Sequence, residues 1–389
     1  MSEAAAEPVR CAVLPPAPVP YREPLYGRLV ARGRLRLTVI YVTAEQPSWD
    51  MGSGWFGAQG AYDSVHLRSW QRPRRRPGRT PIAVPRGLWR ELERLDPRCV
   101  VSWEFGPATL LALLWCRLRG RALVIFSELP PQADEILSAP QRRLHRLVAP
   151  RVDGFVVASS AAKRRAVSLG APAETVEVSL QSAEVERFRG AAVARREHPP
   201  ARPLRVLCVA RLVPDKNLQR LLAAWARAGI GGDEAELELC GTGPLEGELR
   251  GLADELGVPV RFRGYLAPAD LPTAYAESDA FALVSTFEPF GVAVREAAAA
   301  GLPLLCSDVA GAAGDIAIGG RNALLVDPSD EDAIATALGS LVGNRELRLS
   351  MARQSDAVTA ERDPEHDAEA FERAVLGAAE RRGASDRSC

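Results

Sequence analysis

Two short segments of the chain carry charged residues whose spacing could bind and polarise a phosphorylated ligand. In STFEPFGVAVREAAAAGLPLL, residues 285–305, Glu288 follows a predicted strand and Glu296 lies eight positions later, within a predicted helix. At a rise of about 1.5 Å per residue, Glu296 lies roughly 8 Å along the helix axis from Gly291. The two carboxylates can therefore contact different parts of one elongated ligand, and Gly291 lets the backbone approach that ligand closely.

The second segment is VLCVARLVPDKNLQRLLAAW, residues 206–225, in which Arg211 and Lys216 follow a predicted strand. A helix is expected to begin near Asn217, which is a favourable N-cap residue. Two cations beside the N–H groups of a helix N-terminus make an anion site that suits a phosphate group.

Plainer structural roles are available for the same residues. Glu288 could cap the helix that follows it, Glu296 could pair with Arg295 or another surface base, and the two cations could be ordinary surface residues. Against this, Glu296 interrupts an otherwise apolar helix face, and Arg211 and Lys216 follow an equivalent strand in the same half of the chain. We therefore interpret the four charged side chains as parts of one binding site.

A regular alternation of strands and helices must position these segments. Short apolar or β-branched runs separated by helical patterns are typical of buried parallel strands. Strands are predicted at 11–15, 36–42, 99–103, 122–127, 154–159, 204–210, 235–241, 260–266, 280–285, 303–307 and 323–327. Helices are predicted at 107–120, 217–228, 244–256, 270–277, 291–300, 330–342 and 364–382. This alternation predicts an α/β protein with two doubly wound parallel sheets, which bind ligands at the carboxyl ends of their strands.

The length of 389 residues suggests about two domains. The charged and proline-rich segment ARREHPPARP, residues 194–203, predicts the linker between them. We expect an N-terminal domain over 1–197, a C-terminal domain over 198–363 and a closing helical segment over 364–389.

Composition excludes several classes of protein. With 47% hydrophobic and 25% charged residues the chain is an ordinary globular protein. It has no apolar run of the roughly 20 residues that a membrane-spanning helix needs, and its acidic, proline-containing N-terminus does not fit a signal peptide. Its seven scattered cysteines form no Cys-x-x-Cys pair, which predicts a cytoplasmic protein with free thiols.

The segment at 68–94 is strongly basic, with nine arginines and two glutamates, and it includes Trp70 and Trp89. One interpretation is a solvated, arginine-rich loop. The other interpretation is a surface that binds an anionic partner, either a membrane or a phosphorylated acceptor. A membrane partner would make the protein peripheral at the inner membrane face. No recognised nucleic-acid-binding motif accompanies the charge, so a nucleic acid partner is not expected.

The motifs quoted above resemble those of the family 4 glycosyltransferases, which are retaining enzymes of the GT-B fold. FEPFGVAVREAAAAGLPLL resembles the E-x7-E signature of that family, and VARLVPDKN resembles its donor-phosphate motif. Further similarity lies in CGTGP at 240–244, VRFRGYL at 260–266, SDVAGAAGD at 307–315 and RNALLVDPSDEDAIATAL at 321–338. The similarity spans 204–340, whereas the first half is similar only diffusely, chiefly at 14–29 and 151–170.

The resemblance implies two Rossmann-like domains that face a central cleft, with the C-terminal helix packing back on the first domain. It implies retaining, metal-independent transfer of a hexosyl group from a nucleotide-diphosphate-sugar donor to a hydroxyl acceptor (a glycan, a lipid-linked molecule or a small molecule), with no cofactor. It also gives each predicted site residue a contact with the donor. Arg211 and Lys216 would contact the diphosphate, Glu288 a sugar hydroxyl, Glu296 the ribose, the N–H groups of Phe290 and Gly291 the sugar and phosphate, and the main chain near Tyr265 the base.

The departures from the family pattern concern the acceptor. LPPAPVPYREP, near the first strand, stands where many relatives have a glycine-rich loop, and Ser127 and Glu128 stand where relatives often have a histidine. Glu128 is therefore the acceptor-side candidate, with an ordinary loop acid as the alternative. The acids at 330–332 are expected to open a helix and not to bind a metal. Two other functions stay open, a nucleotide-sugar 2-epimerase of the same fold and a non-catalytic nucleotide-sugar-binding protein.

Overall fold

The structure is a computed structural model that describes residues 7–43, 62–72, 82–189, 191 and 203–386. The chain divides into two compact units. Unit 1 comprises the described residues up to Ser182 together with those from Pro364 onward, and unit 2 runs from Ala183 to Asp363.

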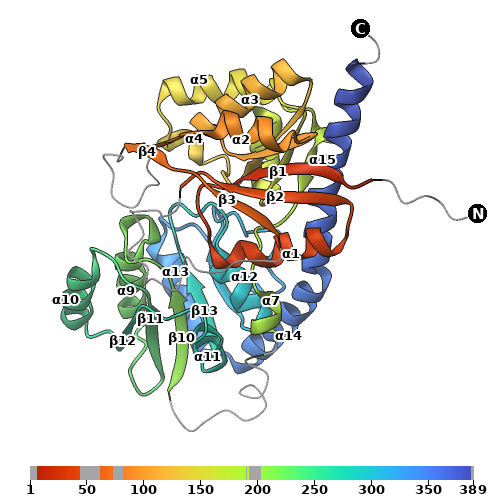
Figure 1. The fold of residues 1–389 in the computed structure, drawn as a ribbon. Helices are drawn as coiled ribbons and strands as arrows, with labels where there is room; N and C mark the ends of the chain where they lie inside the picture. The colour runs from red at the N-terminus through yellow and green to blue at the C-terminus, as the bar shows by residue number, and fades with distance from the viewer. Residues whose placement is uncertain (1–6, 44–61, 73–81, 190, 192–202, 387–389) are drawn as a thin grey trace, which may run out of the picture. The chain divides into compact units, whose positions relative to one another are not determined.

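Unit 1 is built on a seven-stranded sheet with the order β3-β2-β1-β6-β7-β8-β9, in which every pair of neighbours is parallel (Figure 1). Its strands are β1 Val9–Leu14, β2 Leu35–Tyr41, β3 Asp63–His66, β6 Cys99–Trp103, β7 Ala122–Ser127, β8 Gly154–Val157 and β9 Val176–Val178. The strand order reverses between β1 and β6. The carboxyl ends of these two strands therefore form a switch point, which is where doubly wound sheets bind ligands.

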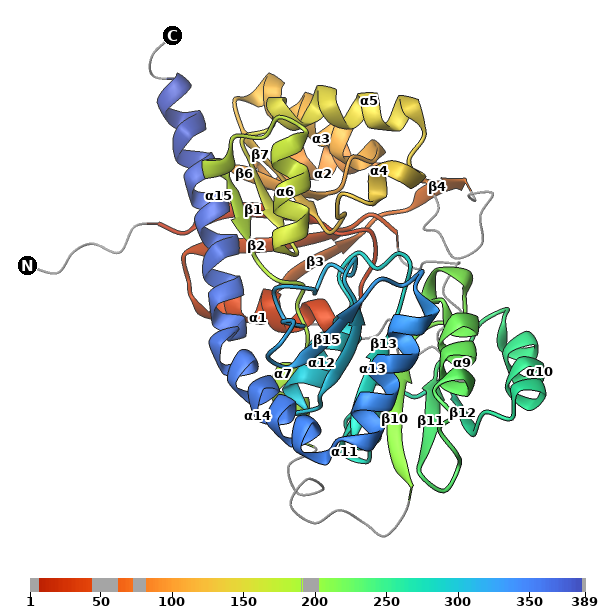
Figure 2. The ribbon, with the colours of Figure 1, turned by 180° about the vertical axis from the view of Figure 1, so that it is seen from behind.

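Helices cover both faces of the unit 1 sheet (Figure 2). On one face, α1 (Glu23–Ala31) and α15 (Pro364–Asp386) enclose a core that includes Phe371 and Val375, both fully buried. On the other face, α2 (Leu88–Leu95) and α3 (Pro107–Arg119) enclose a second core around Trp115. The alternating in–out pattern of the strands therefore buries apolar side chains on both sides of the sheet.

An antiparallel hairpin occupies part of the basic segment for which a solvated loop was one interpretation. Its strands are β4 (Ser69–Arg72) and β5 (Ile82–Pro85), with Trp70 opposite Val84. Residues 73–81 between them lie outside the described part of the chain. The many arginines and prolines of this segment conceal the strand pattern, because they depart from the apolar runs that predict buried parallel strands.

Unit 2 contains a six-stranded parallel sheet with the order β12-β11-β10-β13-β14-β15. Its strands are β10 Leu204–Val209, β11 Ala235–Cys240, β12 Val260–Gly264, β13 Ala280–Leu283, β14 Leu304–Ser307 and β15 Ala323–Val326. Its helices are α7 Val185–Phe188, α9 Leu218–Arg227, α10 Glu246–Leu256, α11 Leu271–Ala276, α12 Val292–Ala299, α13 Glu331–Gly343 and α14 Arg345–Glu361. The strand order reverses between β10 and β13, so these strands form the switch point of this unit.

The two predicted doubly wound parallel sheets are confirmed. The division between the units falls after Ser182, earlier than the expected boundary at 197/198, because α7 packs against α11 and α12 of unit 2. The expected linker at 194–203 lies outside the described residues, apart from its last residue. The C-terminal helix α15 belongs to unit 1, where it contacts α1 and the strands β6 to β9.

Candidate active site

The switch point of unit 2 joins residues from the two segments that the sequence singles out. Lys216 ends a short 3-10 turn (Pro214–Lys216) after β10, and Glu288 lies in the loop after β13. Nζ of Lys216 forms an ion pair with Oε2 of Glu288, and the Ser285 hydroxyl donates to the same oxygen over 3.3 Å. Both side chains are largely shielded from solvent. The two predicted site residues therefore lie side by side, although 72 positions separate them in the sequence.

Hydrogen bonds hold the two loops together. The backbone N–H and the hydroxyl of Thr286 both donate to the carbonyl oxygen of Asp215, over 3.0 and 3.3 Å. The sequence predicted that the side chain of Asn217 caps α9, but it makes no such hydrogen bond. Its backbone is left-handed (φ 57°), and its amide donates instead to the carbonyl oxygens of Val284 and Pro328. Asn217 thus fixes the Lys216 loop to the end of β13.

The loop that carries Glu288 is braced from the other side by the segment after β14. The N–H of Gly311 donates to the Glu288 carbonyl over 3.0 Å, and the N–H of Ala312 donates to the Phe290 carbonyl over 2.8 Å. A Cβ atom on Gly311 would lie 2.0 Å from the carbonyl oxygen of Pro289, so this close approach requires glycine. Gly291 has φ 98°, a conformation that favours glycine, and leads directly into α12.

Glu288 does not cap α12, and Glu296 pairs with a tyrosine. No side-chain hydrogen bond caps α12 at Gly291. Oε2 of Glu296 accepts a hydrogen bond of 2.8 Å from the hydroxyl of Tyr275, a fully buried residue on α11. Arg295, the alternative partner for Glu296, donates to the Arg362 carbonyl oxygen. Burial raises the pKa of Glu296 to about 7, and the hydrogen bond from Tyr275 opposes that rise.

The remaining predicted donor residues lie at carboxyl ends of strands in the same sheet. Arg211 follows β10 and is partly exposed. Phe290 is buried, with 2% of its surface exposed, so its side chain packs in the core while its carbonyl is held by Ala312. Tyr265 follows β12, the edge strand, and is partly exposed; burial raises the pKa of its hydroxyl.

Taken together, these residues can bind an elongated, anionic and hydroxylated ligand. Lys216, Arg211 and the N-terminus of α12 supply positive charge for a phosphate group. The carboxylates of Glu288 and Glu296 accept hydrogen bonds from hydroxyl groups. Sequence reasoning missed Ser285 and Tyr275, because nothing in the chain marks which distant hydroxyl will face a carboxylate.

Unit 1 has its own polar cluster at the switch point, centred on Glu128. Oε1 of Glu128 accepts hydrogen bonds from Arg22 at 2.9 Å, Gln181 at 3.1 Å and Trp103 at 3.2 Å. Beside it, Glu104 accepts the backbone N–H of Glu128 over 2.7 Å, and burial raises the pKa of Glu104 to about 7. Of these five residues, sequence reasoning identified only Glu128.

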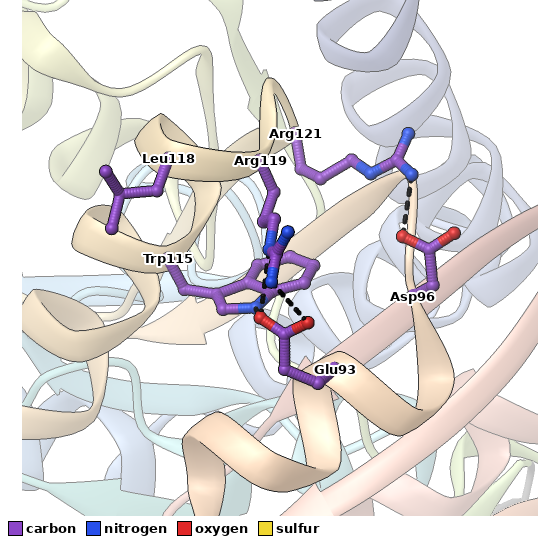
Figure 3. A pocket seen from close by; sticks show the side chains of 6 residues that line it. All are labelled: Glu93, Asp96, Trp115, Leu118, Arg119 and Arg121. Atoms are coloured by element: carbon purple, nitrogen blue, oxygen red, sulfur yellow. Dashed lines mark hydrogen bonds and ion pairs between the residues drawn. The ribbon is translucent and has the colours of Figure 1, made fainter.

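A pocket of unit 1, shown in Figure 3, lies at the end of the sheet opposite to the Glu128 cluster. It is lined by Glu93, Asp96, Trp115, Leu118, Arg119 and Arg121. Glu93 accepts hydrogen bonds from Trp115 and Arg119, and Asp96 pairs with Arg121. These residues precede β6 and β7, so the pocket sits at the amino ends of the strands and its charges are already paired. It is a poor candidate for the active site.

Within the described residues, no three His, Cys, Asp or Glu side chains gather closely enough to hold a metal ion. No described helix combines the length and apolar character that crossing a membrane requires.

Two family models match the chain, one in each half. Residues 25–179 match the model named Glycosyltransferase Family 4, and residues 193–357 match the model named Glycosyl transferases group 1. The second match contains every predicted donor residue, and the first contains Glu128.

Curated relatives and solved structures agree with these matches. The chain is 29% identical to the GDP-mannose-dependent alpha-(1-6)-phosphatidylinositol monomannoside mannosyltransferase of Mycobacterium tuberculosis, over 76% of this chain and 80% of that protein. It is 32% identical to the D-inositol 3-phosphate glycosyltransferase of Corynebacterium jeikeium, over 57% of this chain and 48% of that protein.

Among solved structures, Anabaena HepE in complex with UDP has a TM-score of 0.69 at 18% identity, covering 98% of this chain and 100% of that one. The sucrose-phosphate synthase of Thermosynechococcus elongatus has a TM-score of 0.70 at 18% identity, covering 94% and 98%. The fold is GT-B, as predicted.

Proposed function

This chain belongs to the family 4 glycosyltransferases and is an enzyme that transfers a sugar; from that premise, we propose which part of the donor each site residue holds and how the transfer proceeds. The observation that carries the proposal is the contact between Lys216 and Glu288 at the switch point of unit 2. In this proposal Lys216 would contact the diphosphate, and Glu288, next to it, would contact the sugar. The bond between sugar and phosphate would lie beside this pair of side chains.

The other donor contacts extend from this pair. Arg211 would share the diphosphate charge with Lys216, and the N–H groups of Phe290 and Gly291 would contact the sugar and phosphate. Glu296 would hold the ribose hydroxyls, and the main chain at Tyr265 would contact the base. The positions of these residues at the carboxyl ends of β10, β12 and β13 support the assignment.

The transfer would proceed with retention and without a protein nucleophile. As the bond between the anomeric carbon and the phosphate oxygen breaks, negative charge develops on the departing diphosphate, where Lys216 and Arg211 stabilise it. The acceptor oxygen would bond to the anomeric carbon from the face that the phosphate leaves, and its proton would pass to the departing phosphate oxygen. Because the two cations and the α12 N-terminus supply the positive charge, the reaction would need no metal ion or cofactor.

For the substrates, we propose GDP-mannose as the donor and an inositol-containing lipid as the acceptor. Support comes from the M. tuberculosis relative, whose name specifies GDP-mannose and phosphatidylinositol monomannoside. The C. jeikeium relative is also named for an inositol acceptor. Glu128 would contact the acceptor.

The test measures donor binding and transfer separately. Lys216→Ala should raise the calorimetric Kd for GDP about 10- to 100-fold, because a charge-assisted hydrogen bond is lost. Glu288→Gln should leave GDP binding nearly unchanged and reduce transfer from GDP-mannose. Arg250→Ala, which removes an exposed cation on α10, is the matched control. An unchanged Kd in Lys216→Ala would refute the phosphate assignment, and loss of transfer in EDTA with recovery in Mg²⁺ would refute metal independence.

We also propose that the protein works in the cytoplasm, at the inner membrane face, through its basic 68–94 segment. Trp70, Ile82 and Val84 lie on one face of the β4–β5 hairpin and are exposed at 54%, 39% and 37%. The exposed side chains of Arg68 and Arg86 flank them. Exposed tryptophan beside arginine suits the boundary of an anionic bilayer. The six cysteines among the described residues are free and buried, in keeping with a reducing compartment.

Vesicle sedimentation tests this contact. The protein should sediment with phosphatidylinositol-containing vesicles more than with phosphatidylcholine vesicles, and less so as salt rises. Trp70→Ser should weaken sedimentation, whereas Arg345→Glu, an exposed site in unit 2, should not. Equal sedimentation of Trp70→Ser and the unaltered protein would refute the hairpin as the contact.

A further inference from the structure

The Glu128 cluster of unit 1 draws on four strand ends. Arg22 follows β1, Trp103 ends β6, Glu128 follows β7 and Gln181 follows β9. Three of them donate a hydrogen bond to one atom, Oε1 of Glu128. A surface acid does not need such support, and buried donors that converge on one carboxylate fix its position and its orientation.

Only one of the two oxygens of the Glu128 carboxylate is held by hydrogen bonds. Among the described residues, every hydrogen bond to the Glu128 carboxylate ends on Oε1, and none ends on Oε2. The side chain is 22% exposed, whereas Arg22 and Gln181 are exposed at only 6% and 2%. An anchored carboxylate with one unused oxygen can accept a hydrogen bond from a ligand.

Arg22 is held in a way that a purely structural ion pair does not require. Its guanidinium stacks over the Trp103 ring at 4.7 Å and bonds Glu128 through one terminal nitrogen, whereas its buried Nε has no hydrogen-bond partner in the described chain. A pair that served only stability would be expected to use both nitrogens of the fork. Phe126 stacks with Trp103 at 4.1 Å. The Trp103 ring, which contacts Arg22 and Phe126, serves the cluster as a platform and N–H donor.

Glu104 fixes the backbone from which Glu128 projects. One oxygen of Glu104 accepts the Glu128 N–H over 2.7 Å, and the other accepts the Ser127 hydroxyl over 3.0 Å. Glu104 itself has a left-handed backbone with φ 51°, and Thr109 donates to its carbonyl over 2.7 Å. Such a backbone costs energy for a residue other than glycine and often marks a functional site.

We propose that Oε2 of Glu128 binds a hydroxyl group of the acceptor, and that Arg22 and Glu104 are positioning residues that act through Glu128. The proposal rests on the proposed function and deepens it. Because a carboxylate oxygen accepts hydrogen bonds, the site suits a polyhydroxylated ring and disfavours an acceptor that presents phosphate oxygens at this point.

The experiment compares transfer with hydrolysis of the same donor. The full-length protein is assayed with GDP-mannose, and transfer to phosphatidylinositol vesicles and to free myo-inositol is measured beside slow hydrolysis by water. Glu128→Gln should reduce kcat/KM for the acceptor about 10- to 100-fold, because a charge-assisted hydrogen bond is lost. GDP affinity and donor hydrolysis should stay unchanged.

Variants of the positioning residues separate a functional role from a structural one. Trp103→Phe keeps an aromatic side chain and removes the indole N–H that donates to Glu128, so it should raise the acceptor KM with little effect on hydrolysis. Glu104→Gln should act in the same direction, and Arg22→Lys should retain part of the activity that Arg22→Met loses. Glu135→Gln makes the same chemical change at an exposed carboxylate nearby and is the matched control.

The outcomes distinguish the two proposals. If the unaltered protein transfers sugar and Glu128→Gln transfers it equally well, the hydroxyl site is wrong and the proposed function stands. An equal loss of transfer and hydrolysis in Glu128→Gln would also refute the site, because it would indicate general damage. If the unaltered protein neither binds GDP nor transfers sugar from GDP-mannose, the proposed function fails and the hydroxyl site fails with it.

Discussion

At the scale of single residues, the environment of Glu296 makes a prediction about pH. Burial raises its pKa to about 7, and the ionised carboxylate accepts hydrogen bonds from ribose hydroxyls more strongly than the protonated acid does. GDP affinity should therefore fall as the pH drops below about 7, by up to about tenfold per unit. Calorimetry between pH 5.5 and 8 measures this, and the ratio of the Kd values of Glu296→Gln and the unaltered protein removes the titration of GDP itself.

The raised pKa of Glu296 also determines how the stability of the protein changes with pH. The folded protein keeps a proton on Glu296 that the unfolded chain loses near pH 4.5, so the contribution of this group to the free energy of unfolding falls as pH rises from about 4.5 to 7. Tyr275→Phe should move the midpoint for GDP binding to higher pH, because the hydrogen bond from Tyr275 favours the ionised form. A midpoint that does not move would contradict this role of Tyr275.

At this scale the sequence predicted that Lys216 and Glu288 belong to one site, and the two side chains do form an ion pair, but it did not predict the groups that hold them. Lys216 and Glu288 were predictable because each follows an apolar strand at which charge is out of place. Ser285, Tyr275, Arg22 and Trp103 were not, because a serine or a tyrosine within an apolar pattern is usual in a core. Their roles depend on which strand ends become neighbours, and that follows from the order of the strands in the sheet.

At the scale of elements, the segment after β14 braces the loop that carries Glu288, and a substitution of Gly311 tests this brace. A Cβ at this position would lie 2.0 Å from the Pro289 carbonyl oxygen and 2.8 Å from Cα of Phe290. Gly311→Ala should therefore displace the loop that carries Glu288, lower the free energy of unfolding by about 1–3 kcal/mol and weaken GDP binding.

Gly339→Ala is the control for this prediction. Gly339 lies within α13, and an added Cβ meets no atom within 4 Å. Alanine should stabilise the helix by about 0.5–1 kcal/mol and leave GDP binding unchanged. Chemical denaturation and calorimetry on both variants measure the difference. Equal changes in stability and in GDP binding for the two alanine variants would show that the brace does not position the loop that carries Glu288.

At the scale of the whole molecule, the sequence predicted the two parallel sheets well and the limits of the units less well. Strand positions were predictable because buried parallel strands are apolar throughout, as at Ala122–Ser127. The β4–β5 hairpin was not, since the arginines and prolines in and around its strands interrupt the apolar pattern. The end of unit 1 was also missed, because the composition changes at 194–203 while the packing already changes at Ser182.

Unit 1 is assembled from both ends of the chain, which predicts where removal of the last helix will act. Ala368, Phe371, Ala374, Val375 and Ala378 of α15 are buried in one core with residues of β1, β2, β6, β7 and β8. The chain shortened to residues 1–363 should lose the protection of β1 and β6 amides against hydrogen exchange, because a deleted core side chain of this size costs about 2–5 kcal/mol and a whole domain is stable by only about 5–15 kcal/mol.

A matched pair of substitutions on α15 makes this test finer. Phe371→Ala should lower the free energy of unfolding of unit 1 by about 3–5 kcal/mol, since it leaves a cavity in that core. Arg373→Ala, two positions along the same helix, removes an exposed pair with Glu177 and should cost at most about 1 kcal/mol. GDP binding should survive both substitutions, because every proposed donor residue lies between Ala183 and Asp363. Hydrogen exchange that changes equally in the strands of both units would contradict separate cores and, with them, the assignment of α15 to unit 1.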